Sequence, residues 1–70
     1  MTQREMIKQL ITSGDQALCD DCIAELLGFS QRQTANQYAR LMNAQGEIKR
    51  SQFKEQCDRC KSIKLVNRRI

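Results

Sequence analysis

CDDCIAELLGFSQRQTANQYARLM, residues 19–42, is the stretch of this 70-residue chain that decides its fold. Its first part repeats apolar residues at helical spacing and then stops at a glycine: Cys22, Ile23, Leu26, Leu27 and Gly28. This pattern predicts a helix over about residues 20–27, for which Asp20 or Asp21 would supply the N-cap. Ser30 and Gln33 then form a hydroxyl-x-x-Gln capping box, which predicts a longer helix over about residues 30–45. Two helices joined by a glycine turn are typical of the helix-turn-helix motif.

The residues before this stretch predict one more helix. Thr2 and Glu5 form a capping box in front of an apolar stripe, so a first helix is expected over about residues 3–13. Gly14 then stands where a left-handed residue commonly ends a helix. Ala17 and Leu18 are expected to form a very short strand before the second helix.

The residues after it predict a β-hairpin. From Glu47 onward, polar and apolar residues alternate on both sides of a cysteine-bearing turn, which favours a hairpin over about residues 47–66. Ile48 and Phe53 have opposite parity in this pattern. A bulge must therefore lie between them if both side chains face the core.

Length and composition restrict the class of protein. Seventy residues without proline, internal repeat or low-complexity segment predict one domain over residues 1–70, of mainly α class with a small β-hairpin (α+β). Phe29, Tyr38 and Phe53 are the only aromatic residues available to the core, so a staple such as a metal ion is expected. The sequence has no apolar run of membrane-spanning length and no secretory signal pattern, so a cytoplasmic protein without membrane contact is expected.

Two cysteine pairs, Cys19-x-x-Cys22 and Cys57-x-x-Cys60, carry the most specific chemistry. Two pairs of this spacing can complete a tetrahedral four-thiolate site, which predicts one structural Zn²⁺ bound by all four cysteines. The 34 residues between the pairs exceed the spacing of a local zinc ribbon, so the ion would join the second helix to the hairpin tip. An iron–sulfur cluster is the less favoured alternative, while disulfides and a thioredoxin-like centre fit the sequence poorly.

An enzyme is not expected. The chain contains no histidine, which removes the commonest general base. Four thiolates would fill the coordination shell of zinc and leave no position for an activated water. We therefore predict a non-enzymatic protein with no small-molecule substrate.

The net charge of +4 is unevenly distributed along the chain. Two basic and five acidic residues precede Ser30, whereas ten basic and three acidic residues lie from Ser30 onward. A basic second half favours a polyanionic partner such as nucleic acid, while a charge of this size is also ordinary for a soluble domain.

The predicted third helix has two chemically different faces. Ala35, Tyr38, Ala39 and Met42 form the apolar face. The opposite face carries amide and guanidinium groups, which are the types that pair with base edges: Arg32, Gln33, Asn36, Gln37 and Arg40. Lys54, Arg59 and Lys61 in the hairpin are candidate phosphate contacts, which Lys64, Arg68 and Arg69 would extend. A merely solvated face or a protein-binding face is the alternative.

The predicted order of helix, short strand, helix, turn, helix and hairpin resembles a winged helix-turn-helix domain, and residues 19–42 look like small bacterial winged-helix domains that carry two CxxC pairs. The resemblance implies a recognition helix over residues 30–45 and a wing over residues 47–66 that contacts the phosphate backbone. It also implies that the short strand lies beside the wing, which would bring the two cysteine pairs together.

The function expected from these features is DNA binding in transcription regulation. The partner would be double-stranded DNA, read in the major groove, and a homodimer or a larger complex is expected for tight binding. A protein-interaction adaptor of the same fold is one alternative. The other is a regulator in which the metal or redox state of the cysteines switches DNA binding.

Overall fold

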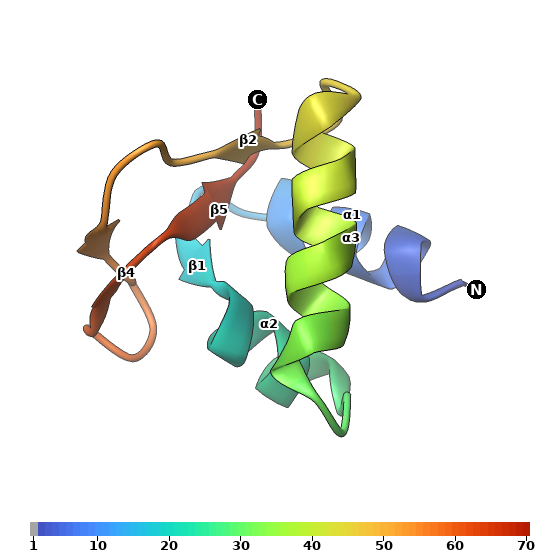
Figure 1. Ribbon diagram of the computed structural model, residues 1–70, viewed down its shortest axis with the longest axis horizontal. Coiled ribbons are helices and arrows are strands. Elements are labelled where there is room, and N and C mark those ends of the chain that lie inside the picture. Colours follow the sequence, from blue (N-terminus) through green and yellow to red (C-terminus); the bar gives the residue numbers. More distant parts are fainter. Residues whose placement is uncertain (1) are drawn as a thin grey trace.

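The computed structural model describes residues 2–70 and begins with three helices interrupted by one short strand. A hairpin of four short strands follows (Figure 1). The elements in chain order are α1 (Gln3–Thr12), β1 (Leu18–Cys19), α2 (Asp20–Leu27), α3 (Arg32–Ala44), β2 (Lys49–Arg50), β3 (Glu55–Gln56), β4 (Ile63–Lys64) and β5 (Val66–Arg68). The predicted α+β class, the three helices, the short strand and the hairpin are confirmed, and the hairpin continues two residues further than expected, to Arg68.

The strands form two small antiparallel sheets. β5 is the central strand of the first sheet, whose order is β1-β5-β2, and β3 pairs with β4 in the second. Cys19 lies opposite Val66, and Lys49 lies opposite Arg68. Figure 1 shows the first sheet between α3 and the β3–β4 hairpin, so that the hairpin projects away from the helices. The sheet therefore joins the strand that leads into α2 to the base of the hairpin.

A bulge separates the two sheets. Ser51 exchanges hydrogen bonds with Val66, since its backbone N–H donates to the Val66 carbonyl at 2.9 Å and its hydroxyl accepts from the Val66 N–H at 2.9 Å. The next pair is Glu55 with Lys64, so residues 52–54 lie opposite Leu65 alone. A bulge was expected between Ile48 and Phe53 if both were buried. The bulge is present, but only Ile48 is buried, because the extra residues turn Phe53 outward to 76% exposure.

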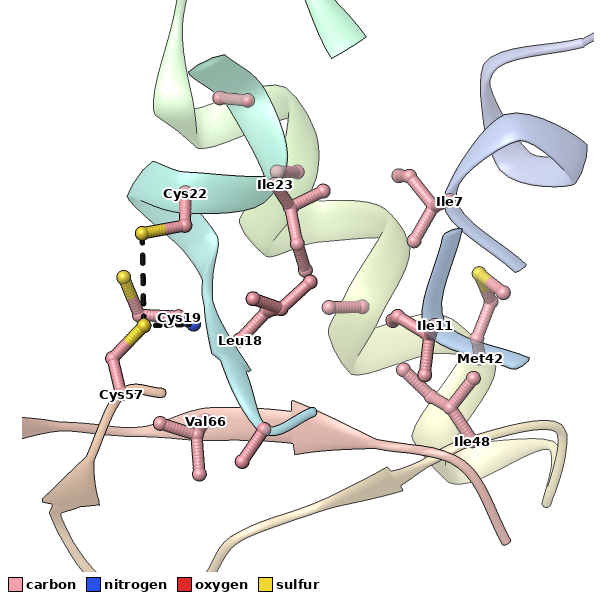
Figure 2. Packing of buried hydrophobic residues seen from close by; sticks show 14 residues of the cluster. Ile7, Ile11, Leu18, Cys19, Cys22, Ile23, Met42, Ile48, Cys57 and Val66 are labelled. Atoms are coloured by element: carbon pink, nitrogen blue, oxygen red, sulfur yellow. Dashed lines mark hydrogen bonds between the residues drawn. The ribbon is translucent and has the colours of Figure 1, made fainter. Parts of the chain in front are cut away.

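The core is one cluster shared by the helices and the central sheet. α1 contributes Ile7 and Ile11, and α2 contributes Ile23 (Figure 2). On α3, Ala35, Ala39 and Met42 are buried as predicted, and Tyr38 packs against the cluster while half-buried. Burial at these positions follows the helical spacing of the apolar residues, because only one face of each helix can reach the core.

Three predicted helix caps are wrong. Gly14 is not left-handed: α1 ends at Ser13 in the right-handed region, and the Thr12 and Ser13 hydroxyls donate to the carbonyls of Lys8 and Leu10 instead.

The other two wrong caps are the N-caps of α2 and α3, although α2 itself spans Asp20–Leu27 as predicted. Neither aspartate caps α2, whose N-cap is Cys19, because both carboxylates bind side chains from other elements. Ser30 does not cap α3, which begins at Arg32 after Gln31. By contrast, Thr2 accepts a hydrogen bond from the Glu5 N–H, and Gly28 ends α2 with φ 74°, both as predicted.

Candidate functional site

The four cysteines converge on one point in space. Their sulfurs all lie within 4.8 Å of one another. Cys19 Sγ is 3.7 Å from Cys60 Sγ, and Cys22 Sγ is 3.6 Å from Cys57 Sγ, and none of the four is in a disulfide. Around a tetrahedral ion with metal–sulfur bonds of about 2.3 Å, neighbouring sulfurs are about 3.8 Å apart. The spacing therefore suits four thiolates around a metal ion, and the predicted clustering of the two pairs is confirmed.

Each pair is placed by a different part of the fold. Cys19 ends β1 and Cys22 lies in the first turn of α2, so both sulfurs leave the same helix start. Cys57 and Cys60 belong to the turn between β3 and β4, where the Lys61 N–H donates to the Cys57 carbonyl at 2.9 Å. Lys61 has φ 66°, a left-handed conformation that closes the turn. Figure 2 shows the sulfurs of Cys19, Cys22 and Cys57 facing one another across the gap between α2 and the hairpin.

Backbone contacts reinforce this junction. The Cys19 N–H donates to the Cys57 sulfur at 3.4 Å. Asp58 accepts the Ala17 N–H on its carboxylate at 2.7 Å, and its own N–H donates to the Ala17 carbonyl at 2.9 Å. These bonds tie the hairpin tip to the strand that precedes α2.

The hairpin has almost no core of its own. Between Arg50 and Val66, Cys57 is the one buried residue. Phe53 and Ile63 are exposed to 76% and 60%, respectively. An isolated two-stranded hairpin is at best marginally stable in water. The position of the hairpin therefore depends on the cysteine cluster and on the base of the sheet.

The four thiols have unequal acidity. Burial raises the pKa of Cys19 to about 12, and it also raises the pKa of Cys22. At Cys57 burial acts in the same direction, but several backbone hydrogen bonds outweigh it and lower the pKa. Backbone and side-chain hydrogen bonds from Ser62 lower the pKa of the exposed Cys60 to about 6. Because cysteine binds metal as the thiolate, loading this site would release protons, those of Cys19 and Cys22 among them.

The outer face of α3 is polar, as predicted. Arg32, Gln33, Gln37 and Arg40 are exposed, and Arg32 lies 3.5 Å from the Asp21 carboxylate. Asn36 differs from the other candidates, because it is half-buried and its amide donates to the Asp20 carboxylate at 2.9 Å. Four of the five candidate base-reading residues are therefore exposed, with Arg32 paired to Asp21, and the fifth is half-buried and held by Asp20.

The predicted phosphate contacts fall into two groups, those with and those without an acidic partner. Lys54 and Lys61 are exposed and form no salt bridge within residues 2–70, whereas Arg59 pairs with Glu25 of α2 at 3.1 Å. That carboxylate raises the pKa of Arg59 above its usual range, with a further contribution from the Cys22 thiol. Three further basic residues pair with acidic partners: Lys64 with Asp21, Arg68 with Glu55 and Arg69 with Asp15.

Sequence reasoning missed a polar cluster beside the cysteines. Arg50 of β2 forms two hydrogen bonds with the Asp20 carboxylate, at 2.8 Å and 2.9 Å, and a third with the Asn67 side chain at 2.9 Å. Asn67 is fully buried although it lies in a short strand. The only hint in the sequence is an asparagine directly after Val66 in the predicted hairpin. Nothing in the sequence distinguishes Arg50 from the other basic residues.

A groove of about 420 Å³ runs between α3 and the hairpin. Its lining includes Asp20, Asn36 and Arg50 of the polar cluster and the acidic Asp21, together with basic and apolar side chains, among them Arg32, Lys54, Ile63 and Leu65. The groove thus joins the exposed face of α3 to the basic residues of the hairpin.

Comparison with family models, with curated proteins and with solved structures gives no match for this chain. Among residues 2–70, no helix has both the length and the apolar character needed to cross a membrane.

Proposed function

We propose that this chain is a non-enzymatic, zinc-stabilised DNA-binding module of the winged-helix type that acts in transcription regulation. In this proposal α3 enters the major groove as the recognition helix, and the segment from β2 to β5 is the wing that contacts the phosphate backbone. The element order and the antiparallel sheet β1-β5-β2 support the fold assignment, because the strand before α2 pairs with the hairpin as a winged helix requires.

The metal is proposed to be Zn²⁺ in a structural role. In a four-iron cluster each thiolate binds a different iron, so the sulfurs must lie further apart than they do around one ion. The mutual spacing within 4.8 Å therefore supports a single ion. Three of the four ligands are buried, and four thiolates complete a tetrahedral shell without an open position for water. This donor set supports a structural site and speaks against catalysis.

The observation that carries the DNA-binding proposal is the location of the unpaired cations. Within residues 2–70, four basic residues form no salt bridge: Arg40, Lys49, Lys54 and Lys61. One lies on the outer face of α3 and the other three lie in the hairpin. The cations of α1, Arg4 and Lys8, instead pair with Glu47. Unpaired positive charge beside exposed amide side chains is the chemistry that binds phosphates and base edges.

The test is an NMR titration of the metal-loaded chain with a pool of random-sequence duplex DNA. We expect the backbone amide shifts of residues 32–40 and 54–61 to move, while those of α1 stay in place. Shifts confined to α1, or no shifts at DNA concentrations well above that of the protein, would contradict the proposal. Lys8→Gln serves as a control, because this exposed cation lies on α1 and its loss should leave binding unchanged.

A second candidate function is favoured by the exposure of Cys60, the one cysteine of the four that solvent reaches. Loss of the metal or oxidation at this ligand would then switch DNA binding. Chelation separates the two functions. A metal-free chain that keeps its helices but releases DNA would favour the responsive regulator, whereas a chain that unfolds would favour a structural metal.

The adaptor alternative predicts a different outcome. Leu41, Phe53 and Ile63 are exposed apolar residues on α3 and the hairpin, which a protein partner could cover. Binding of a stoichiometric protein in place of salt-dependent binding of DNA would select the adaptor.

A further inference from the structure

The Asp20 carboxylate receives four hydrogen bonds from three other elements. Arg50 of β2 donates two, at 2.8 Å and 2.9 Å, and forms a bidentate ion pair. Asn36 of α3 donates one at 2.9 Å, and Asn67 of β5 donates one at 2.9 Å. Asp20 is the first residue of α2, so this single side chain connects α2, α3 and both strands at the base of the hairpin.

The cluster is largely hidden from water. The side chains of Arg50 and Asp20 are 9% and 14% exposed, and Asn67 is fully buried. Asn67 also donates to the Leu18 carbonyl at 3.0 Å, which fixes it against β1. Within residues 2–70, no buried side-chain nitrogen or oxygen lacks a hydrogen-bond partner, so the network is complete.

A buried ion pair of this kind adds little net stability. The cost of removing both charges from water roughly cancels their attraction, so a neutral pair of similar size would be about as stable. What the charged pair supplies is a unique geometry, because any other arrangement leaves a buried charge without its partner. Here the elements so fixed are α3 and the base of the hairpin, which form the two sides of the groove.

We propose that Asp20 and Arg50 are positioning residues that set the orientation of α3 relative to the hairpin, and that they thereby determine sequence selectivity without touching DNA. The selectivity part rests on the proposed function, whereas the orientation part stands on the geometry alone. Asn36 belongs to this cluster as the contact from α3, so base reading is left to Arg32, Gln33 and Gln37, while Arg40 is counted among the phosphate contacts.

The test uses the double variant Asp20→Asn/Arg50→Gln in the full chain with its metal. This variant removes one negative and one positive charge, so the net charge is unchanged and neither residue is left as an unpaired buried ion. Arg4→Gln/Glu47→Gln is the matched control, because it neutralises an ion pair on the α1 side of the molecule. Residual dipolar couplings report whether α3 and β2–β5 still share the wild-type orientation. Enrichment from a random duplex pool reports selectivity.

We expect the couplings of the double variant to depart from the wild-type α3–hairpin geometry. We also expect its preference for the enriched duplexes over the random pool to fall about tenfold, since one well-aligned base contact is worth that much. Affinity for the random pool should stay within about twofold, because phosphate contacts depend on charge. The control should match wild type in every measurement.

The outcomes separate the two proposals. Unchanged couplings in the double variant would overturn the positioning role, whatever happens with DNA. Changed couplings with full selectivity would overturn the link between orientation and reading. Changed couplings in a chain whose wild type shows no selective binding would support the orientation role and count against the proposed function. If the double variant does not fold, Asn36→Ala, which removes only the bond from α3, is measured in the same way, and unchanged couplings there overturn the proposal.

Discussion

The four unpaired cations make the salt dependence of DNA binding calculable. Each phosphate neutralised by a lysine or arginine contributes about −0.9 to the slope of log affinity against log salt concentration. If Arg40, Lys49, Lys54 and Lys61 each meet one phosphate, the slope is about −3.6. Affinity should then fall about 150-fold between about 50 mM and about 200 mM salt.

The salt slopes of single variants show how much each residue contributes to the total. Lys61→Gln removes one contact, so the slope should become about −2.7 and the fall over the same range about 40-fold. Lys8→Gln should keep the wild-type slope, because Lys8 lies on α1 and pairs with Glu47. Gln37→Ala should also keep it, because a neutral side chain on α3 reads bases without displacing counterions.

The assay is fluorescence anisotropy of a labelled random-sequence duplex, titrated with the metal-loaded protein at several salt concentrations. A wild-type slope shallower than about −1 would refute the assignment of these cations to phosphates. The same conclusion would follow if Lys8→Gln lowered the slope as much as Lys61→Gln, because the charge would then act without regard to its position.

Two further predictions concern the fold. Removing the metal with a chelator should abolish the amide-exchange protection of Cys57 and its neighbours in the hairpin and lower the thermal midpoint. The reason is that a structural zinc contributes on the order of 10 kcal/mol to the free energy of folding. An unchanged midpoint in protein shown to be metal-free would contradict a structural metal. Gly28→Ala should destabilise the chain by about 1 kcal/mol in urea denaturation, because φ at this position is 74° although the added methyl group meets nothing within 4 Å. Gly14→Ala, which has equal space and no left-handed φ, should instead be neutral or stabilising by up to about 1 kcal/mol, and equal losses at both glycines would count against the conformational explanation.

Periodicity and spacing were sufficient to predict the main elements. Ala35, Ala39 and Met42 recur at helical intervals, and the structure buries all three on the inner face of α3. The cysteine pairs could be assigned to one cluster because two-residue gaps suit thiolates on a common ion. Both inferences use information that lies within a few residues of sequence or in a strong motif, which is why they hold.

The details that failed depend on distant partners. Asp20 was expected to cap α2, but its carboxylate binds Arg50, 30 residues further along the chain. Asn36 was predicted to face outward with the other amides, yet it meets that same carboxylate. Local preference identified Asp20 as a cap and Asn36 as a surface residue, and tertiary contacts overrode both. Phe53 was considered for the core because it is aromatic. The sequence argument for a bulge assumed that Phe53 is buried, whereas the bulge in the structure turns Phe53 outward.

Cys19 and Asp20 are consecutive residues with two different roles in holding the hairpin. Cys19 belongs to the cysteine cluster, which ties the hairpin tip to α2, while Asp20 ties the base of the hairpin and α3 to the same helix start. Since Cys57 is the one buried residue between Arg50 and Val66, hydrophobic packing cannot replace either connection. The two connections fail in different ways: loss of the metal should release the tip and remove binding free energy that stabilises the whole chain, whereas loss of the ion pair should leave the tip bound and let α3 change its angle. The geometry of the groove between α3 and the hairpin therefore depends on polar and metal-binding groups more than on burial of apolar surface.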